Sequence, residues 1–90
     1  MKLTSLNGVL EMQRKTTVLK GLSFNLLVEE VHHVDPKGGL VCYVASIYLQ
    51  EHGTAEKRLV RRSRIVGAAA ELKREIKRDG IQVFDRFKNL

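Results

Sequence analysis

Residues 22–50, LSFNLLVEEVHHVDPKGGLVCYVASIYLQ, contain two apolar runs on either side of a strong turn signal. In the first run, 22–31, apolar and polar residues alternate, and this period of two is typical of a half-buried strand. The second run, 40–50, is apolar on both faces, which predicts a central strand or a strand covered by a partner. The segment 35–39 between them reads DPKGG. Because Asp can bond to the backbone, Pro fixes φ and Gly accepts positive φ, we expect a hairpin here.

The alternation continues toward the N-terminus. Between residues 10 and 28 most even-numbered positions are apolar, so we expect one or two short strands before residue 22. An amphipathic helix over 5–13 is the alternative, although Gly8 weakens it. The first eight residues lack the apolar core of a signal peptide, and no apolar run approaches the roughly 20 residues of a membrane-spanning helix. We therefore expect a cytoplasmic protein without membrane contact.

Residues 54–79 have the features of a helix with a break in it. Thr54 can cap its start, and Gly80 is a usual stop signal. The apolar stripes of its two halves lie about a quarter-turn apart, so a straight helix cannot present both to one sheet. This mismatch predicts a break, a kink or a new start between residues 63 and 67. The alternative is a further strand over 55–62, hairpinned at residues 52–53, with the helix beginning near Ser63.

These elements together predict an α+β fold. We expect an antiparallel meander of three or four strands packed against a long or broken C-terminal helix, and residues 81–84 alternate enough for a short returning strand. The chain has 90 residues, 43% of them hydrophobic and 29% charged, which is typical of one globular domain over 1–90. Because so small a domain often buries further surface against a second copy, we also expect a homodimer.

The net charge of +6 is concentrated in one part of the chain. Residues 1–53 carry equal numbers of cations and acids, whereas residues 54–79 carry nine cations and four acids. Within that segment, 57–64 has five cations and no acid. A positive field focused on one surface attracts polyanions, whereas scattered charge only improves solubility.

This charge distribution favours a nucleic-acid ligand. Guanidinium groups match phosphate oxygens in pairs, and a helix presents them at groove-sized spacing. We therefore expect a non-catalytic nucleic-acid-binding protein that contacts the phosphates of RNA or DNA through a basic helix. The expected contact residues are the cations of 57–64 and two cations further along the helix: Lys57, Arg58, Arg61, Arg62, Arg64, Lys73 and Arg74. The alternative is a protein-interaction module or small inhibitor of the mobile-element type, whose basic face engages an acidic protein, because the two-sided apolar run 40–50 could be shared with a partner.

Catalytic, cofactor and metal sites are not expected from the sequence. No pair of carboxylates and no cluster of Ser, His and acid has a recognisable nucleophile signature, so we do not expect an enzyme. His32 and His33 are adjacent on a predicted strand and point to opposite faces, so with His52 they would make a poor metal site. Cys42 is the only cysteine. It cannot form an internal disulfide, and its apolar neighbours predict a small buried side chain.

The order of strands followed by the Ala-rich segment 67–72 (GAAAEL) is similar to the second half of a double-stranded RNA-binding domain. This resemblance covers architecture only. A convincing first helix is absent, and the lysine cluster that usually opens the last helix is replaced by the segment 61–64 (RRSR). The resemblance therefore adds no residue to the expected contact set.

Overall fold

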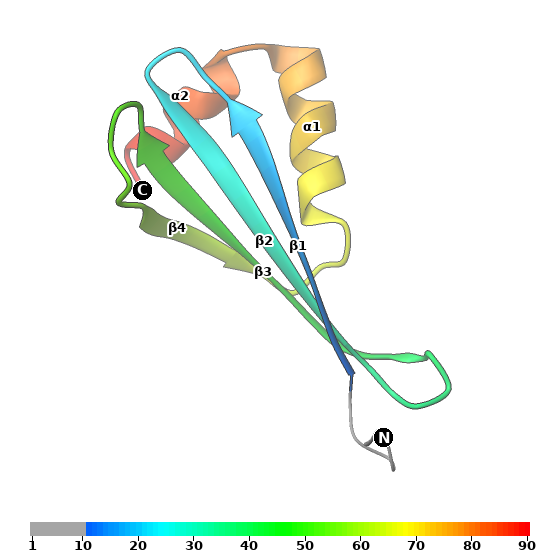
Figure 1. The fold of residues 1–90 in the computed structure, drawn as a ribbon. Coiled ribbons are helices and arrows are strands. Elements are labelled where there is room, and N and C mark those ends of the chain that lie inside the picture. Colours follow the sequence, from blue (N-terminus) through cyan, green and yellow to red (C-terminus); the bar gives the residue numbers. More distant parts are fainter. Residues whose placement is uncertain (1–10) are drawn as a thin grey trace.

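The computed structural model describes residues 11–90, which form a four-stranded antiparallel sheet followed by two helices. The strands lie in the order β1-β2-β3-β4, and both helices lie on the same side of the sheet (Figure 1). The elements are β1 (Glu11–Lys20), β2 (Phe24–Val34), β3 (Leu40–Glu51), β4 (Arg58–Ser63), α1 (Ala68–Asp79) and α2 (Gln82–Lys88). The predicted α+β class, with its antiparallel meander and C-terminal helical part, is confirmed.

The turn between β2 and β3 has the structure that its sequence predicts. One carboxylate oxygen of Asp35, Oδ1, accepts hydrogen bonds from the backbone N–H of Lys37 at 2.9 Å and of Gly39 at 2.7 Å. Gly38 has a φ of 85°, in the left-handed region that favours glycine. The hairpin is therefore specified by local sequence.

The core lies between the helices and one face of the sheet. The register of β2 and β3 turns alternate residues of both strands toward the helices. Leu19 of β1 and three residues of the helix layer, Ala69, Leu72 and Val83, belong to the same buried cluster. The other members of the cluster are Phe24, Leu26, Val28, Tyr43, Ala45, Ile47, Leu49, Phe84 and Phe87.

The strand expected before residue 22 is present as β1, but its apolar even-numbered positions do not face the core. The register pairs Val18 with Leu27 and Leu19 with Leu26. Leu19 is therefore buried against the core, whereas Val18 lies on the opposite face with 49% of its surface exposed. Residues 11–13 belong to β1, so the alternative helix over 5–13 is wrong for those residues. Residues 1–10, including the segment considered for a signal peptide, lie outside the described residues.

Residues 58–63 form a strand, so the expectation that 54–64 begins a helix is wrong. The alternative of a further strand is confirmed, because β4 pairs with β3 in antiparallel register, with Leu59 opposite Tyr48 and Ser63 opposite Ala45. The strand covers 58–63 rather than 55–62, and the helix begins at Ala68 rather than near Ser63. The predicted cap, Thr54, lies in the loop between β3 and β4. Without β4, one row of backbone N–H and C=O groups of β3 would have no partner in the sheet, and this tertiary requirement overrides the helix propensity of Lys, Arg and Leu.

Helix α1 begins after the predicted break. Gly67 at its N-cap has a φ of 92°, and the Ser63 hydroxyl accepts a hydrogen bond from the backbone N–H of Ile65 at 3.1 Å. At the other end, the N–H of Gly80 donates to the carbonyl of Ile76 at 2.7 Å. The predicted stop at Gly80 is confirmed, and of the break, kink or new start expected between residues 63 and 67 the structure has a new start, with Gly67 as the N-cap.

The short returning strand expected over 81–84 is wrong, because residues 82–88 form α2. Val83, Phe84 and Phe87 are all buried in the core. A strand would point Val83 and Phe84 to opposite faces, whereas a helix turns residues spaced in this way to one side. Burial of all three apolar side chains therefore favours the helix.

Tyr43 links the sheet to the start of α1. Its hydroxyl donates to Glu30 Oε2 at 2.7 Å and accepts a hydrogen bond from the backbone N–H of Ala68 at 3.1 Å. Glu30 is only 6% exposed, so the tyrosine is the donor to an almost buried carboxyl group. Burial, the largest cause, raises the pKa of Tyr43 above its ordinary value of 10.0, and the hydrogen bond with Glu30 raises it further.

Replacing Tyr43 with phenylalanine is expected to lower the free energy of unfolding by about 1–3 kcal/mol, because Glu30 stays buried without its donor. Because the pKa of Tyr43 is raised in the folded state, the stability that its hydroxyl contributes to the wild type is fully present below pH 10.0. This stability is lost as the pH rises through the folded-state pKa of Tyr43. Urea unfolding at about pH 8 and about pH 11 measures both effects. If the free energy of unfolding of the variant fell as much at alkaline pH as that of the wild type, this role of Tyr43 would be contradicted.

Candidate nucleic-acid interface

Strand β4 brings four arginines to one edge of the sheet. Its only neighbour in the sheet is β3, so its other side is a free edge among residues 11–90. The β4 arginines are Arg58, Arg61 and Arg62, together with Arg64 directly after the strand. At about 3.3 Å per residue they extend over about 20 Å. None of the four is paired with an Asp or Glu side chain among the described residues.

The β4 arginines lie on both faces of the sheet, and a β-bulge decides which of them face the helices. The register between β3 and β4 shifts between Ile47 and Tyr48, which leaves Val60 as the extra residue. Arg61 lies opposite the core residue Ile47 and faces the helices, whereas Arg62 lies opposite Ser46 and faces away from them. The edge is therefore positive on both of its sides.

The two β4 arginines on the helix side also attach α2 to the sheet. The guanidinium carbon of Arg61 lies 4.8 Å from the ring centroid of Phe87. Arg58 donates from Nη1 to the backbone carbonyl of Leu90 at 2.7 Å. Because an arginine has five N–H donors, each keeps several for another ligand.

Lys57 precedes β4 and lies on the face away from the helices. Its Nζ is 2.7 Å from Glu29 Oε2 and 4.4 Å from the ring centroid of Tyr48. The hydrogen bond with Glu29 is the main reason why the pKa of Lys57 lies above its ordinary value. This cation is therefore already paired with an acidic side chain, unlike the β4 arginines.

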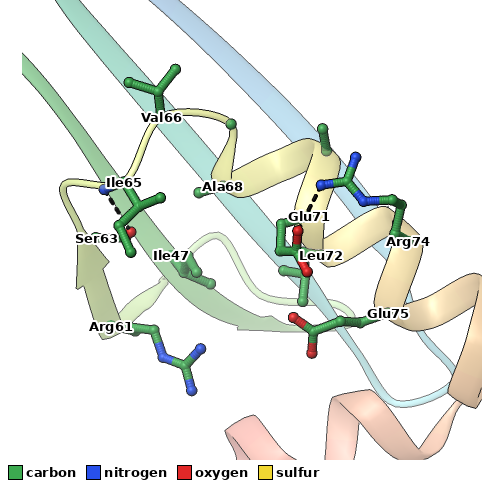
Figure 2. Close-up of a pocket in the computed structure, with 12 residues that line it drawn as sticks. Ile47, Arg61, Ser63, Ile65, Val66, Ala68, Glu71, Leu72, Arg74 and Glu75 are labelled. Atoms are coloured by element: carbon green, nitrogen blue, oxygen red, sulfur yellow. Dashed lines mark hydrogen bonds and ion pairs between the residues drawn. The ribbon is translucent and has the colours of Figure 1, made fainter.

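The two predicted contact residues on α1 lie apart from β4. A groove of about 450 Å³ separates β4 from α1, with Ile47, Ile65, Val66 and Leu72 among its lining residues. Arg61 from β4 and Glu75 from α1 point into it from opposite sides (Figure 2). Arg74 forms an ion pair with Glu71 at 2.6 Å, and Lys73 is exposed on the same helix. The structure thus brings Lys57 and the β4 arginines together but places Lys73 and Arg74 across the groove.

The histidines and the cysteine lie in separate environments. The ring of His32 packs edge-on against Tyr43, with centroids 4.9 Å apart, and His52 Nε2 is 3.1 Å from Asn25 Oδ1. Cys42 lies opposite His33 in the register and is half-buried rather than fully buried. Residues 11–90 contain no group of three or more His, Cys, Asp or Glu placed to hold a metal ion. Over the same range no helix is both long and apolar enough to cross a membrane. The cytoplasmic location and the homodimer remain predictions.

The sheet face opposite the helices, here called the open face, has an apolar row that the sequence analysis did not identify. Val18, Leu27, Tyr48 and Leu59 are successive partners across the four strands. The apolar even-numbered positions of β1 and the two-sided run 40–50 were its signal in the sequence. Only the register shows that they meet on one face.

The chain matches no protein-family model, and no curated protein or solved structure matches it. Its function is therefore argued from geometry and charge.

Proposed function

We propose that this protein is a non-catalytic nucleic-acid-binding protein that contacts the phosphate backbone along β4. The observation that supports this most strongly is the line of four β4 arginines on a free edge, none of which is paired with an Asp or Glu side chain among residues 11–90. Guanidinium groups form paired, charge-assisted hydrogen bonds with phosphate oxygens. The binding element is then a strand rather than the basic helix expected from the sequence.

The proposed contact residues differ in the partners that they already have in the structure. Arg62 and Arg64 are exposed and act mainly on phosphates. Arg58 and Arg61 add their remaining N–H donors while they keep α2 in place. Lys57 supplies charge at the start of the strand, once a phosphate competes with Glu29 for its ammonium group.

Salt-dependent binding tests this proposal directly. Labelled single-stranded and duplex RNA and DNA are titrated with the protein, and the affinity is measured by fluorescence anisotropy at about 50 and about 200 mM salt. With four or five phosphate contacts, counterion release lowers the affinity by about a hundredfold between these two conditions. Dissociation constants in the millimolar range for all four ligands at low salt would refute the proposal.

The groove beside β4 favours one second candidate, a protein-interaction module. An extended acidic segment could add to the free edge of β4 as a fifth strand, with its acids toward the β4 arginines and an apolar side chain toward Ile65 and Leu72. Copurification after nuclease treatment separates the two functions, because a retained protein partner favours this candidate and loss of the bound material favours nucleic acid. Light scattering of the purified protein tests the predicted homodimer.

A further inference from the structure

The open face carries an apolar surface that no helix of residues 11–90 covers (Figure 1). The apolar row of Val18, Leu27, Tyr48 and Leu59 crosses all four strands. With strands about 4.8 Å apart, it is about 14 Å long. Val18 and Leu59 at its ends are 49% and 42% exposed. An antiparallel sheet that faces water usually presents polar side chains, so this row is suited to a ligand.

Cations surround the apolar row. Lys20, opposite Asn25, lies on one side of it, and Arg14 and Arg62 lie on the other side. Lys57 lies over the Tyr48 ring within the row. Glu29 is the only carboxylate at the described strand positions of this face, and it is bound to Lys57. The strand positions of the open face therefore carry three cations and one acid, and Lys57 from the loop before β4 adds a fourth cation.

We propose that the open face binds single-stranded nucleic acid, with bases against the apolar row and phosphates on the flanking cations. This inference rests on the proposed function and names its substrate class. A single strand exposes the faces of its bases beside an anionic backbone, and proteins bind it by combining a positive track with side chains on which bases stack. Arg62 belongs both to the β4 arginines and to the open face, so one strand can follow the edge and continue across the sheet.

The apolar row favours this ligand over a duplex, and the positive charge of the open face favours it over a second copy of the chain. A duplex keeps its bases stacked inside and presents mainly phosphates and groove edges, so the apolar row adds little to its binding. A second copy docked by a two-fold axis would place the same positive face against itself. Like charges brought together in an interface oppose association.

The contact between Lys57 and Tyr48 fits an exchange of partners on binding. The ammonium group occupies a face of the Tyr48 ring at 4.4 Å from the centroid and is held there by Glu29. A phosphate on the open face gives Lys57 a second anionic partner. Movement of the ammonium group toward that phosphate exposes the ring to a base.

A pair of matched variants tests the inference. Val18→Glu adds an acid on the open face, whereas Ile81→Glu adds an acid between α1 and α2, and the two positions have similar exposure, 49% and 46%. Each variant and the wild type are titrated with a single strand of about 15 nucleotides, with the duplex of the same sequence and with polyglutamate. Thermal unfolding checks that both variants are folded.

We expect the wild type to bind the single strand at least about tenfold more tightly than the duplex. Val18→Glu is expected to weaken single-strand binding by about tenfold, and Ile81→Glu by less than about threefold. Tyr48→Leu, which keeps an apolar side chain but removes the aromatic ring, should weaken single-strand binding several-fold without changing duplex binding.

Any other outcome of these titrations would overturn the inference, and the outcomes can be told apart. Equal affinity for single strand and duplex, or equal losses in Val18→Glu and Ile81→Glu, would refute it while the proposed function stands. Polyglutamate binding as tight as that of the single strand, with the same sensitivity to Val18→Glu, would identify an acidic protein as the ligand instead. Failure of both nucleic acids to bind at low salt would refute the inference and the proposed function together.

Discussion

Replacing Arg62 and Arg64 together with alanine is expected to weaken nucleic-acid binding by about tenfold or more at about 0.1 M salt. Both side chains are exposed, and neither has a carboxylate partner in the described part of the chain. The loss of two phosphate contacts should also lower the slope of log affinity against log salt by about 1.5. Fluorescence anisotropy over a series of salt concentrations measures both quantities.

The matched control removes the same charge elsewhere. Lys37, in the β2–β3 turn, and Lys77, on α1, are both exposed and lie outside the proposed interface. Their double alanine variant is expected to change the affinity by less than about threefold, through the long-range field alone. If the control lost as much affinity as the variant of β4, binding would depend on net charge and not on this edge. Arg58 and Arg61 are less suitable for the test, because their loss would also disturb α2.

Replacing Phe84 with alanine is expected to lower the free energy of unfolding by about 3–5 kcal/mol. The side chain is 4% exposed, and its ring lies edge-on to Phe24 with centroids 5.9 Å apart. A small domain has a total stability of about 5–15 kcal/mol, so the variant is expected to lie near the limit of folding. Urea unfolding followed by circular dichroism measures the change.

Ile81→Ala is the control for this experiment. Ile81 is 46% exposed, and its truncation is expected to cost less than about 1 kcal/mol. If Phe84→Ala cost no more than Ile81→Ala, α2 would not belong to the cooperatively folded unit. Loss of α2 alone would then leave the sheet and α1 folded.

The parts of the fold that local sequence specifies could be predicted. The β2–β3 turn is held by bonds within residues 35–39, with Asp35 as the acceptor. The predicted stop of α1 coincides with Gly80, and the helix starts directly after Gly67, at the end of the segment 63–67 in which a break or new start was expected; both glycines have positive φ. In each case the residues that determine the local conformation lie within a few positions of it. Periodicity and turn chemistry were therefore sufficient to predict it.

Non-local pairing decided the parts that were predicted wrongly. Residues 58–63 have a composition that suits a helix, but they form β4 because Leu59 and its neighbours pair with β3. Residues 81–84 alternate like a strand, but burial of Val83, Phe84 and Phe87 on one side requires a helix. Propensity is a weak prior in both segments, and the packing of the whole chain overrides it.

The candidate site could be predicted in composition but not in arrangement. The run of cations over 57–64 was evident, yet which of its arginines face the helices depends on the bulge at Val60 and on pairing with β3. Predicting the apolar row would have required the register of all four strands. In the β1–β2 hairpin, for example, even-numbered Val18 lies opposite odd-numbered Leu27. An offset of one residue would have sent Val18 to the core.

The position of the β4 arginines on a sheet edge also bears on self-association. An unpaired edge strand is a template on which another chain can add, and this is a common route to aggregation. Two β4 strands that met edge to edge would bring their guanidinium groups together without acids to compensate them. The positive charge thus protects the exposed backbone of β4 from other copies of the protein and keeps that edge accessible to a ligand.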